Sequence, residues 1–314
     1  MPDRTPETPA AVVDAAPSLA PIATPADRFA ILAIDQRGSL ARMLADAGLP
    51  ADGPALSAFK IEVVRALGPG MSGVLLDPDH GLDPVRAAGL PGAGTGVLVT
   101  LEAAERADDA GVRRTQRVPG RDGGYVRQVG GHAGKYLVWM RPDLPPPPGE
   151  PDPIARAVAE AAAVIAECRA AGVLSVVEAL PHPAPGEATL PADRRAITLA
   201  SARLLAPLQP DLLKLEYPGD AATCRQVTEI AGRVPWALLS AGMAFERFRE
   251  ALRVALEAGT SGFIAGRAFW QEAAALQGAE RHRFLSGPGR ERVEQCLELV
   301  AAAGRPWPAA RAGL

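Results

Sequence analysis

Short apolar runs bounded by Gly, Pro or Asp recur along this chain of 314 residues, and most are separated by longer segments of helical period. Runs that are apolar along their whole length and alternate with helices are typical of a parallel sheet covered on both faces. The pattern predicts eight strands, at residues 30–34, 74–76, 97–101, 136–140, 174–180, 212–217, 237–239 and 263–265.

The intervening segments predict helices because their apolar positions recur every three or four residues. The clearest of them cover residues 55–67, 154–171, 193–205, 221–233, 244–258 and 290–303. A second helix near residues 84–88 is brief, and the six glycines between residues 120 and 134 leave room for only a short or irregular third helix.

Eight such units in about 285 residues match an α/β fold of the (β/α)₈ TIM-barrel type, which we expect as a single domain over residues 28–314. An open, doubly wound sheet is the alternative. Its dinucleotide signature is absent, because Gly92, Gly94 and Gly96 precede a strand instead of joining a strand to a helix.

Residues 1–27 are rich in Pro and Ala, carry acidic residues early and lack a basic start followed by an apolar run. We therefore expect a mobile, disordered N-terminal tail over residues 1–27 and no signal peptide. No stretch of the chain approaches the length of a membrane span.

Charge and cysteine content narrow the partners and the compartment. The net charge of −3 gives no electrostatic argument for a nucleic acid or an anionic membrane as a partner, so a small solute is expected. The three cysteines are far apart and odd in number, which suits neither a disulfide framework nor a zinc site and implies a reducing, cytoplasmic location. The sequence leaves open whether the protein forms a homo-oligomer.

Lysine is scarce in this chain: of 33 basic residues only Lys60, Lys135 and Lys214 are lysines. Arginine stays protonated in proteins, whereas a lysine amine that loses its proton can attack a carbonyl and form a Schiff base. Lys214 lies within an apolar run, Leu212-Leu213-Lys214-Leu215, and is the first candidate for such chemistry. Biased codon usage is the alternative, with Lys214 a strand-end residue or half of an ion pair with Glu216.

Alternation along the predicted barrel strands gives these lysines a common location. Lys214 points inward on the sixth strand, Glu178 offers a carboxyl group on the fifth, and Lys135 begins the fourth, so all three face one region. A second ammonium and an apolar wall both lower a lysine pKa, and a nearby carboxyl group can transfer protons. An ion-pair network filling the barrel is the alternative.

The seventh and eighth predicted strands are each followed by a turn of small residues that could bind an anion. Ser240 and Gly242 follow one strand, Gly266 and Arg267 follow the other, and each turn leads into a helix. Small residues let backbone N–H groups approach an anion, and arginine adds a forked donor. Loops at these two places form the usual phosphate site of a barrel.

Other polar groups end the first and second strands. Asp35 and Gln36 could bind sugar hydroxyls, although Asp and Ser near a helix start are also ordinary caps. The segment 77–81 could be a turn, a hydroxyl-binding loop or part of a metal site. Since a metal-dependent enzyme would need several converging histidines and the chain has four in all, we expect neither a metal nor another cofactor.

Together these segments resemble a known family. The motifs that carry the resemblance are Ala33-Ile34-Asp35-Gln36-Arg37-Gly38-Ser39, Leu75-Leu76-Asp77-Pro78, Leu212-Leu213-Lys214-Leu215-Glu216, Leu239-Ser240-Ala241-Gly242 and Ala265-Gly266-Arg267-Ala268-Phe269-Trp270. In this order they resemble the class I tagatose 1,6-bisphosphate aldolase family, which includes sulfofructosephosphate aldolase. The match runs from about residue 28 to residue 300 and leaves the N-terminal tail outside.

The resemblance implies a lyase of the (β/α)₈ fold that reversibly cleaves a phosphorylated ketose to dihydroxyacetone phosphate and an aldehyde, without metal. It implies that Lys214 forms the Schiff base, that Glu178 transfers protons and that Lys135 is a second active-site lysine. The implied substrate-binding groups are Asp35, Gln36, Ser240, Gly242, Gly266 and Arg267. Lys60, in the middle of the first helix, is expected to be structural.

Different segments of the chain resemble two branches of the family, which differ in their substrates. The segments 35–39 and 77–81 are similar to the tagatose-bisphosphate branch, whereas 138–141, which ends in Arg141, and 262–267 are similar to the sulfosugar branch. Arg141 is therefore a further candidate for substrate binding. A glycine-rich third segment and a proline-rich loop at 142–153 depart from the family, and both bear on the distal end of the substrate. Two other functions stay open: a phosphosugar-binding regulator without turnover, and a metal-dependent barrel lyase.

Overall fold

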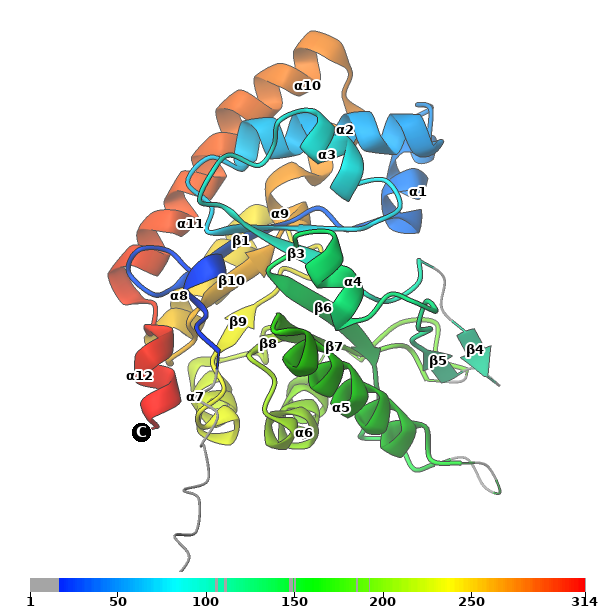
Figure 1. The fold of residues 1–314 in the computed structure, drawn as a ribbon, viewed down its shortest axis with the longest axis vertical. Helices are drawn as coiled ribbons and strands as arrows, with labels where there is room; N and C mark the ends of the chain where they lie inside the picture. The colour runs from blue at the N-terminus through cyan, green and yellow to red at the C-terminus, as the bar shows by residue number, and fades with distance from the viewer. Residues whose placement is uncertain are drawn as a thin grey trace, which may run out of the picture.

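Eight parallel strands close into a barrel in the computed structural model, which describes residues 17–104, 107–109, 112–146, 149, 151–184, 186–191 and 193–313 (Figure 1). Around the barrel the strands follow the order β1-β10-β9-β8-β7-β6-β3-β2. Their bounds are β1 Phe29–Ala33, β2 Gly73–Leu76, β3 Gly96–Thr100, β6 Ala133–Trp139, β7 Leu174–Leu180, β8 Leu212–Leu215, β9 Trp236–Leu238 and β10 Gly262–Ala265. The predicted (β/α)₈ fold is confirmed.

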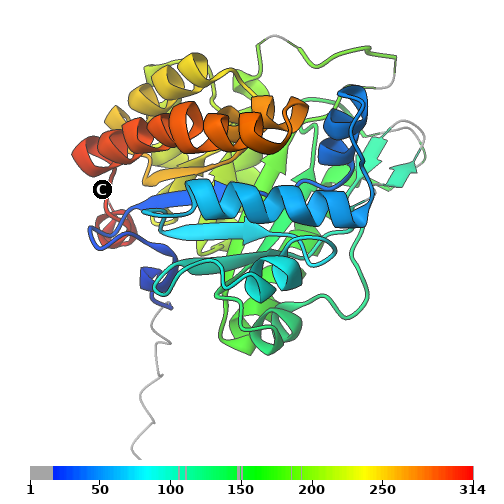
Figure 2. The same ribbon diagram turned by 90° about the horizontal axis from the view of Figure 1, so that it is seen from above.

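Helices cover the outside of the barrel. Several begin at an aspartate whose carboxylate accepts a backbone N–H of the first turn, as Asp52, Asp122, Asp152 and Asp220 do. The helices are α1 Gly38–Asp46, α2 Gly53–Leu67, α3 Leu82–Ala87, α4 Gly123–Gln128, α5 Pro153–Ala171, α6 Arg195–Leu205, α7 Ala221–Ala231, α8 Phe245–Glu257, α9 Arg267–Trp270, α10 Gly278–Phe284, α11 Arg290–Ala303 and α12 Trp307–Ala312. Figure 2 shows α2 and α11 running alongside each other next to β1.

Alternation along the strands produces two apolar layers. Outward side chains such as Leu32, Val74 and Leu213 pack under the helices in the larger cluster. Inward side chains such as Ile31 and Leu212 fill the lower part of the barrel in a second cluster. Because this apolar filling stops below the carboxyl ends of the strands, the polar inward residues are left at the upper end.

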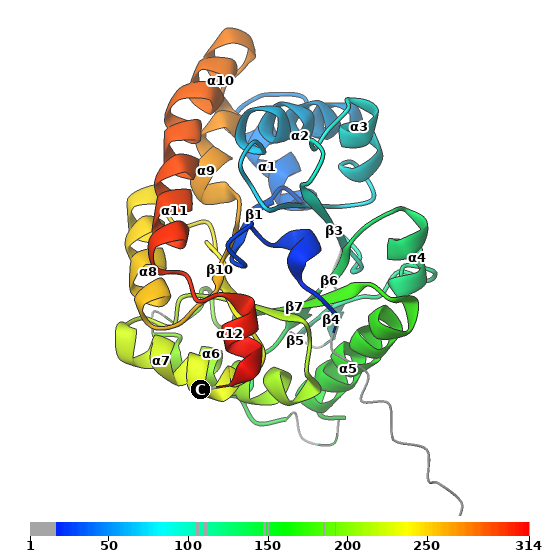
Figure 3. The same cartoon turned by 60° about the vertical axis from the view of Figure 1, so that its left-hand side comes forward.

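The lower end of the barrel is closed by the two ends of the described chain, which corrects the expected tail boundary. Residues 1–16 lie outside the described residues, but Leu19 and Ile22, around the short helix η1 Ala20–Ile22, are fully buried against the inward cluster. The helix α12 lies beside this segment, and Arg311 donates to the backbone oxygen of Pro17 (Figure 3). Burial of apolar side chains under the barrel orders a segment whose composition indicated a tail.

The weakest predicted region is the third βα segment, and it is irregular as expected. Its helix, α4, spans six residues. A two-stranded hairpin precedes α4 and consists of β4 Ala107–Asp109 and β5 Val112–Arg114. The sequence pattern did not predict this hairpin.

Among the helices of the described residues, none is long and apolar enough to cross a membrane.

Candidate active site

Three neighbouring strands bring two lysines to one carboxylate. The parallel register places Glu178 of β7 beside Lys214 of β8, and Lys135 of β6 faces the same region from the other side. The Nζ atom of Lys214 is 2.9 Å from Glu178 Oε1, and the Nζ atom of Lys135 is 3.1 Å from Glu178 Oε2. All three side chains are buried, so the grouping predicted from the sequence is present in the structure.

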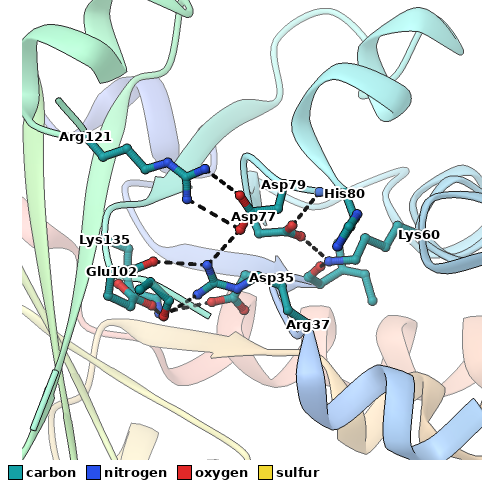
Figure 4. A network of polar contacts seen from close by, with 11 residues as sticks. Asp35, Arg37, Lys60, Asp77, Asp79, His80, Glu102, Arg121 and Lys135 are labelled. Atoms are coloured by element: carbon teal, nitrogen blue, oxygen red, sulfur yellow. Dashed lines mark hydrogen bonds and ion pairs between the residues drawn. The ribbon is translucent and has the colours of Figure 1, made fainter. Parts of the chain in front are cut away.

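Lys135 is surrounded by carboxylates. Besides Glu178, its Nζ atom contacts Asp35 Oδ2 at 3.0 Å and, as its closest partner, Glu102 Oε1 (Figure 4). Burial alone would lower the pKa of Lys135, but the three carboxylates raise this pKa well above its ordinary value. Lys135 is therefore held as a cation.

The carboxylates respond in the opposite direction. Burial tends to raise the pKa of Glu178, but Lys214 and Lys135 outweigh it and hold this pKa below its ordinary value. Asp35 behaves alike: burial acts to raise its pKa, and Lys135 and Lys214 lower it. Both carboxyl groups are consequently ionised at neutral pH.

These groups line a cavity of about 700 Å³ at the carboxyl ends of the strands. Its wall contains the arginines Arg37, Arg42 and Arg267 in addition to the two lysines. The remaining lining residues are Asp35, Gln36, Gly38, Ser39, Glu102, Ala104, Leu137, Trp139, Glu178 and Leu180. An excess of cations around a solvent-accessible hollow suits a small anionic ligand.

The candidate anion-binding residues meet at the ends of β9 and β10. Ala241 and Gly242 both have positive φ angles, +49° and +77°, and the guanidinium of Arg267 lies against Gly242. A Cβ atom on Gly266 would lie 1.8 Å from the backbone oxygen of Ala33, so only glycine fits there. Ser240 is buried in the same turn. The two turns lie side by side, as the sequence predicted.

Gln36 adds a polar group at the cavity. Its Oε1 atom is buried and has no hydrogen-bond partner in the described part of the chain. An unpaired buried oxygen is costly unless a ligand supplies the donor. Gln36 is accordingly placed to accept a hydrogen bond from a hydroxyl group, and Asp35 lines the cavity beside it.

The structure does not bring Arg141 into this cavity. The Arg141 guanidinium forms ion pairs with Asp143 and Glu187 and donates to the backbone oxygen of His182. It lines a separate cavity of about 400 Å³ on the outer side of β6, which contains no lysine. Trp139 lines both cavities. A role for Arg141 in substrate binding stays a prediction.

Lys60 has a structural environment. Its side chain is fully buried, donates to the backbone oxygen of Ile34 and forms an ion pair with Asp77. Asp77 also accepts the backbone N–H of His80 at 2.7 Å, so the segment after β2 is a fixed turn (Figure 4). In the described ranges no three His, Cys, Asp or Glu side chains are grouped as metal ligands.

Two residues of the site, Glu102 and Arg37, were not predicted from the sequence. Glu102 lies two residues beyond the end of β3. Its carboxylate directly follows the apolar run predicted as the strand 97–101, and this was the one signal that could have marked it. Arg37 donates to the backbone oxygens of Glu102 and Ala103 at 3.1 Å and pairs with Asp79 at 3.0 Å. Both residues connect the ends of neighbouring strands around Lys135.

Comparison with known proteins gives related sequences over most of the chain. A family model described as DeoC/LacD family aldolase matches residues 146–272, the part that contains Glu178, Lys214 and the turns after β9 and β10. The chain is 26% identical over 311 residues to a tagatose 1,6-diphosphate aldolase of Listeria monocytogenes, and 89% of each chain is covered. Tagatose 1,6-diphosphate aldolase 2 of Enterococcus faecalis is also 26% identical, over 88% of this chain and 91% of its own.

Solved structures give the same fold. An archaeal fructose 1,6-bisphosphate aldolase is similar with a TM-score of 0.59 and 19% identity, covering 88% of this chain and 96% of its own. A second structure of such an archaeal aldolase, equally similar, has its catalytic lysine covalently bound to the carbinolamine intermediate of the substrate.

Proposed function

The chain belongs to the DeoC/LacD family of aldolases, and from this premise we propose that it is a class I enzyme that cleaves a phosphorylated ketose. Lys214 forms the Schiff base, Glu178 transfers the protons, and no metal takes part. The products are dihydroxyacetone phosphate and an aldehyde. The observation that carries this proposal is that Lys214 contacts the Glu178 carboxylate, which Lys135 also contacts.

The contacts support a distinct role for each group. Glu178, at 2.9 Å, can take a proton from Lys214, and the neutral amine then attacks the ketose carbonyl. The same carboxyl group can protonate the departing hydroxyl of the carbinolamine, so that water leaves and the iminium forms. Glu178, ionised again after this step, then takes the proton of the hydroxyl group on the carbon that becomes the aldehyde, the carbon–carbon bond breaks, and its electron pair passes to the iminium to form an enamine. Protonation of the enamine and hydrolysis by water release dihydroxyacetone phosphate and the free Lys214 amine. Lys135 stays a cation and supplies positive charge beside Glu178.

The cavity also supports a phosphorylated substrate. Arg267 and the turns at Ser240, Gly242 and Gly266 would hold one phosphate beside Lys214, and Asp35 and Gln36 would bind the ketose hydroxyls. We propose tagatose 1,6-bisphosphate or sulfofructose 1-phosphate as the substrate. The tagatose 1,6-diphosphate aldolases with which the chain aligns favour the former.

Borohydride trapping tests the chemistry. Reduction in the presence of dihydroxyacetone phosphate should leave one stable mass adduct, which peptide mapping places on Lys214, and the Lys214→Arg variant should form none. A chelator should leave cleavage unchanged. Absence of the adduct, or strong inhibition by the chelator, would refute a class I mechanism.

A side-by-side cleavage assay identifies the substrate. Tagatose 1,6-bisphosphate, fructose 1,6-bisphosphate and sulfofructose 1-phosphate are compared at equal enzyme concentration, with aldehyde release as the readout. Binding of these sugars in a thermal-shift assay without any aldehyde release would instead indicate a regulator that retains the anion site.

A further inference from the structure

Glu102 is a buried carboxylate whose function the motifs do not explain. It lies two residues beyond the end of β3, contacts Lys135 and lines the cavity. We infer that Glu102 is a positioning residue that holds Lys135 as a bound cation and so leaves Lys214 as the amine that reacts. This inference rests on the Schiff-base chemistry proposed above.

The two lysines differ in the number of their carboxylate partners. An ammonium group has three N–H donors, and three carboxylates, those of Asp35, Glu102 and Glu178, surround Lys135. Lys214 forms one ion pair among the described residues, with Glu178. Loss of a proton from Lys135 would leave three carboxylates without their shared cation, whereas Lys214 can pass its proton to its single partner.

Both oxygens of Glu102 are occupied. Oε1 contacts Lys135, and Oε2 accepts the backbone N–H of Leu137 at 3.2 Å. The ladder between β3 and β6 ends at the pair of Thr100 and Lys135, so the Leu137 N–H would otherwise lack a sheet partner on this side. The Glu102 side chain thus continues the ladder and is held at a fixed position against Lys135.

The backbone of Glu102 is fixed as well. Arg37 donates to the backbone oxygens of Glu102 and Ala103, and Asp79 holds the Arg37 guanidinium in turn (Figure 4). Glu102 also forms an isolated antiparallel bridge with Arg117. Glu102, which lies outside the regular sheet, is therefore contacted by Arg37 from beyond β1 and by Arg117 from the segment that precedes α4, and Asp79 from beyond β2 holds Arg37 in place.

Charge acts on Lys135 from every strand that surrounds it. Asp35 from beyond β1, Glu102 from beyond β3 and Glu178 from β7 favour the protonated form of Lys135. Lys214 lies on the other side of Glu178, and Arg37 lies near Asp35. Without Glu102, two carboxylates would remain for two lysines. Because Glu178 is shared between Lys135 and Lys214, only Asp35 would pair with Lys135 alone, and the protonated form of Lys135 would be less strongly favoured.

Lysine reactivity gives a direct test, because the chain contains three lysines and each can be followed by peptide mass spectrometry. Brief acetylation with acetic anhydride over about pH 6 to 11 modifies neutral amines. In the wild-type protein, acetylation of Lys135 should begin at higher pH than that of Lys214. In Glu102→Gln the midpoint for Lys135 should shift down by about one pH unit or more, the usual effect of removing one close opposite charge.

Two further variants separate charge from shape. Glu102→Asp keeps the negative charge, so its Lys135 midpoint should stay near that of the wild type even if turnover falls. Glu160→Gln removes a carboxylate that accepts the Tyr136 hydroxyl hydrogen bond on the outer side of β6, and should change neither the midpoint nor turnover. The alkaline limb of kcat/KM in Glu102→Gln should move down together with the Lys135 midpoint.

Each outcome decides the inference. If Glu102→Gln loses activity by one factor at every pH, with the limb and the midpoint unchanged, Glu102 is merely structural. If Lys135 and Lys214 of the wild-type protein are acetylated at the same pH, the inference is wrong, whatever the variants show. Absence of a borohydride-stable adduct in the wild type refutes the proposed function instead, and the labelling profile of Lys135 can still be measured.

Discussion

Lys135 and Lys214 contact opposite oxygens of one carboxylate, that of Glu178, at 3.1 and 2.9 Å. In the proposed mechanism this shared partner couples the charge of Lys135 to the proton transfers of Lys214. While Lys135 remains a cation, Glu178 always retains one positive neighbour, and it can exchange a proton with Lys214 without becoming an isolated buried charge.

We predict that Glu178→Gln lowers kcat by about 10²–10⁴-fold, the usual contribution of a positioned general acid–base group. The amide cannot exchange protons, and its NH₂ group would face one of the two lysines. Steady-state cleavage assays measure the effect. Glu167→Gln, which removes an exposed ion pair with Arg117, serves as the control and should retain wild-type kcat. An unchanged kcat in Glu178→Gln would contradict proton transfer by this residue.

Lys60→Met should destabilise the protein by about 3–5 kcal/mol, because Asp77 would remain as a buried charge without its partner. Urea unfolding measures the loss. The double variant Lys60→Met with Asp77→Asn should recover part of it, since an amide oxygen can still accept the His80 backbone N–H. If the double variant is no more stable than Lys60→Met, the ion pair does not account for the loss.

The grouping of the two strand lysines with Glu178 could be predicted from the sequence because it depends on two local rules. Alternation along a strand decides which side chains face inward, and the carboxyl ends of parallel strands meet at one end of a barrel. Strand β7 and helix α11 have the predicted bounds, and Lys135, Glu178 and Lys214 meet as expected.

The features that could not be predicted depend on contacts between distant segments. Glu102 faces Lys135 because β6 extends beyond the last residue of β3, a difference in strand length that sequence alone does not show. Arg141 is held by Glu187, 46 residues later in the chain, and so lies away from the lysines. Leu19 is buried against the inward apolar cluster at the lower end of the barrel. The Pro- and Ala-rich sequence around Leu19 does not reveal this contact.

Arg267→Gln should weaken binding of the phosphorylated substrate. Loss of a hydrogen bond to a charged group costs about 1.5–3 kcal/mol, so KM should rise about 10- to 100-fold. Inorganic phosphate, added as a probe, should protect the wild type against thermal unfolding more than the variant. Arg249→Gln, which removes an exposed pair with Glu246, is the matched control. A fall in kcat with KM unchanged would place Arg267 outside the phosphate site.

Glu216 lies two positions after Lys214, and this position suggested an ion pair between the two side chains. The structure instead pairs Glu216 with Arg194, at 3.2 Å, and one of its oxygens lacks a hydrogen bond within the described residues. Burial raises the pKa of Glu216, the cations Arg194 and Arg267 oppose this, and Glu178 adds to it. The folded protein therefore binds a proton at Glu216 more tightly than the unfolded chain does.

The sign of the pH effect follows from this difference. The stabilisation is complete below the unfolded pKa of about 4.5 and is lost as the pH rises through the higher folded value. In Glu216→Gln the side chain is neutral at every pH and can still accept from Arg194. Urea unfolding at a series of pH values should show the variant gaining stability relative to the wild type as the pH rises, whereas Glu229→Gln, an exposed change on α7, should show no such gain. A relative loss instead would mean that Arg194 binds the ionised carboxylate strongly enough to overcome its burial.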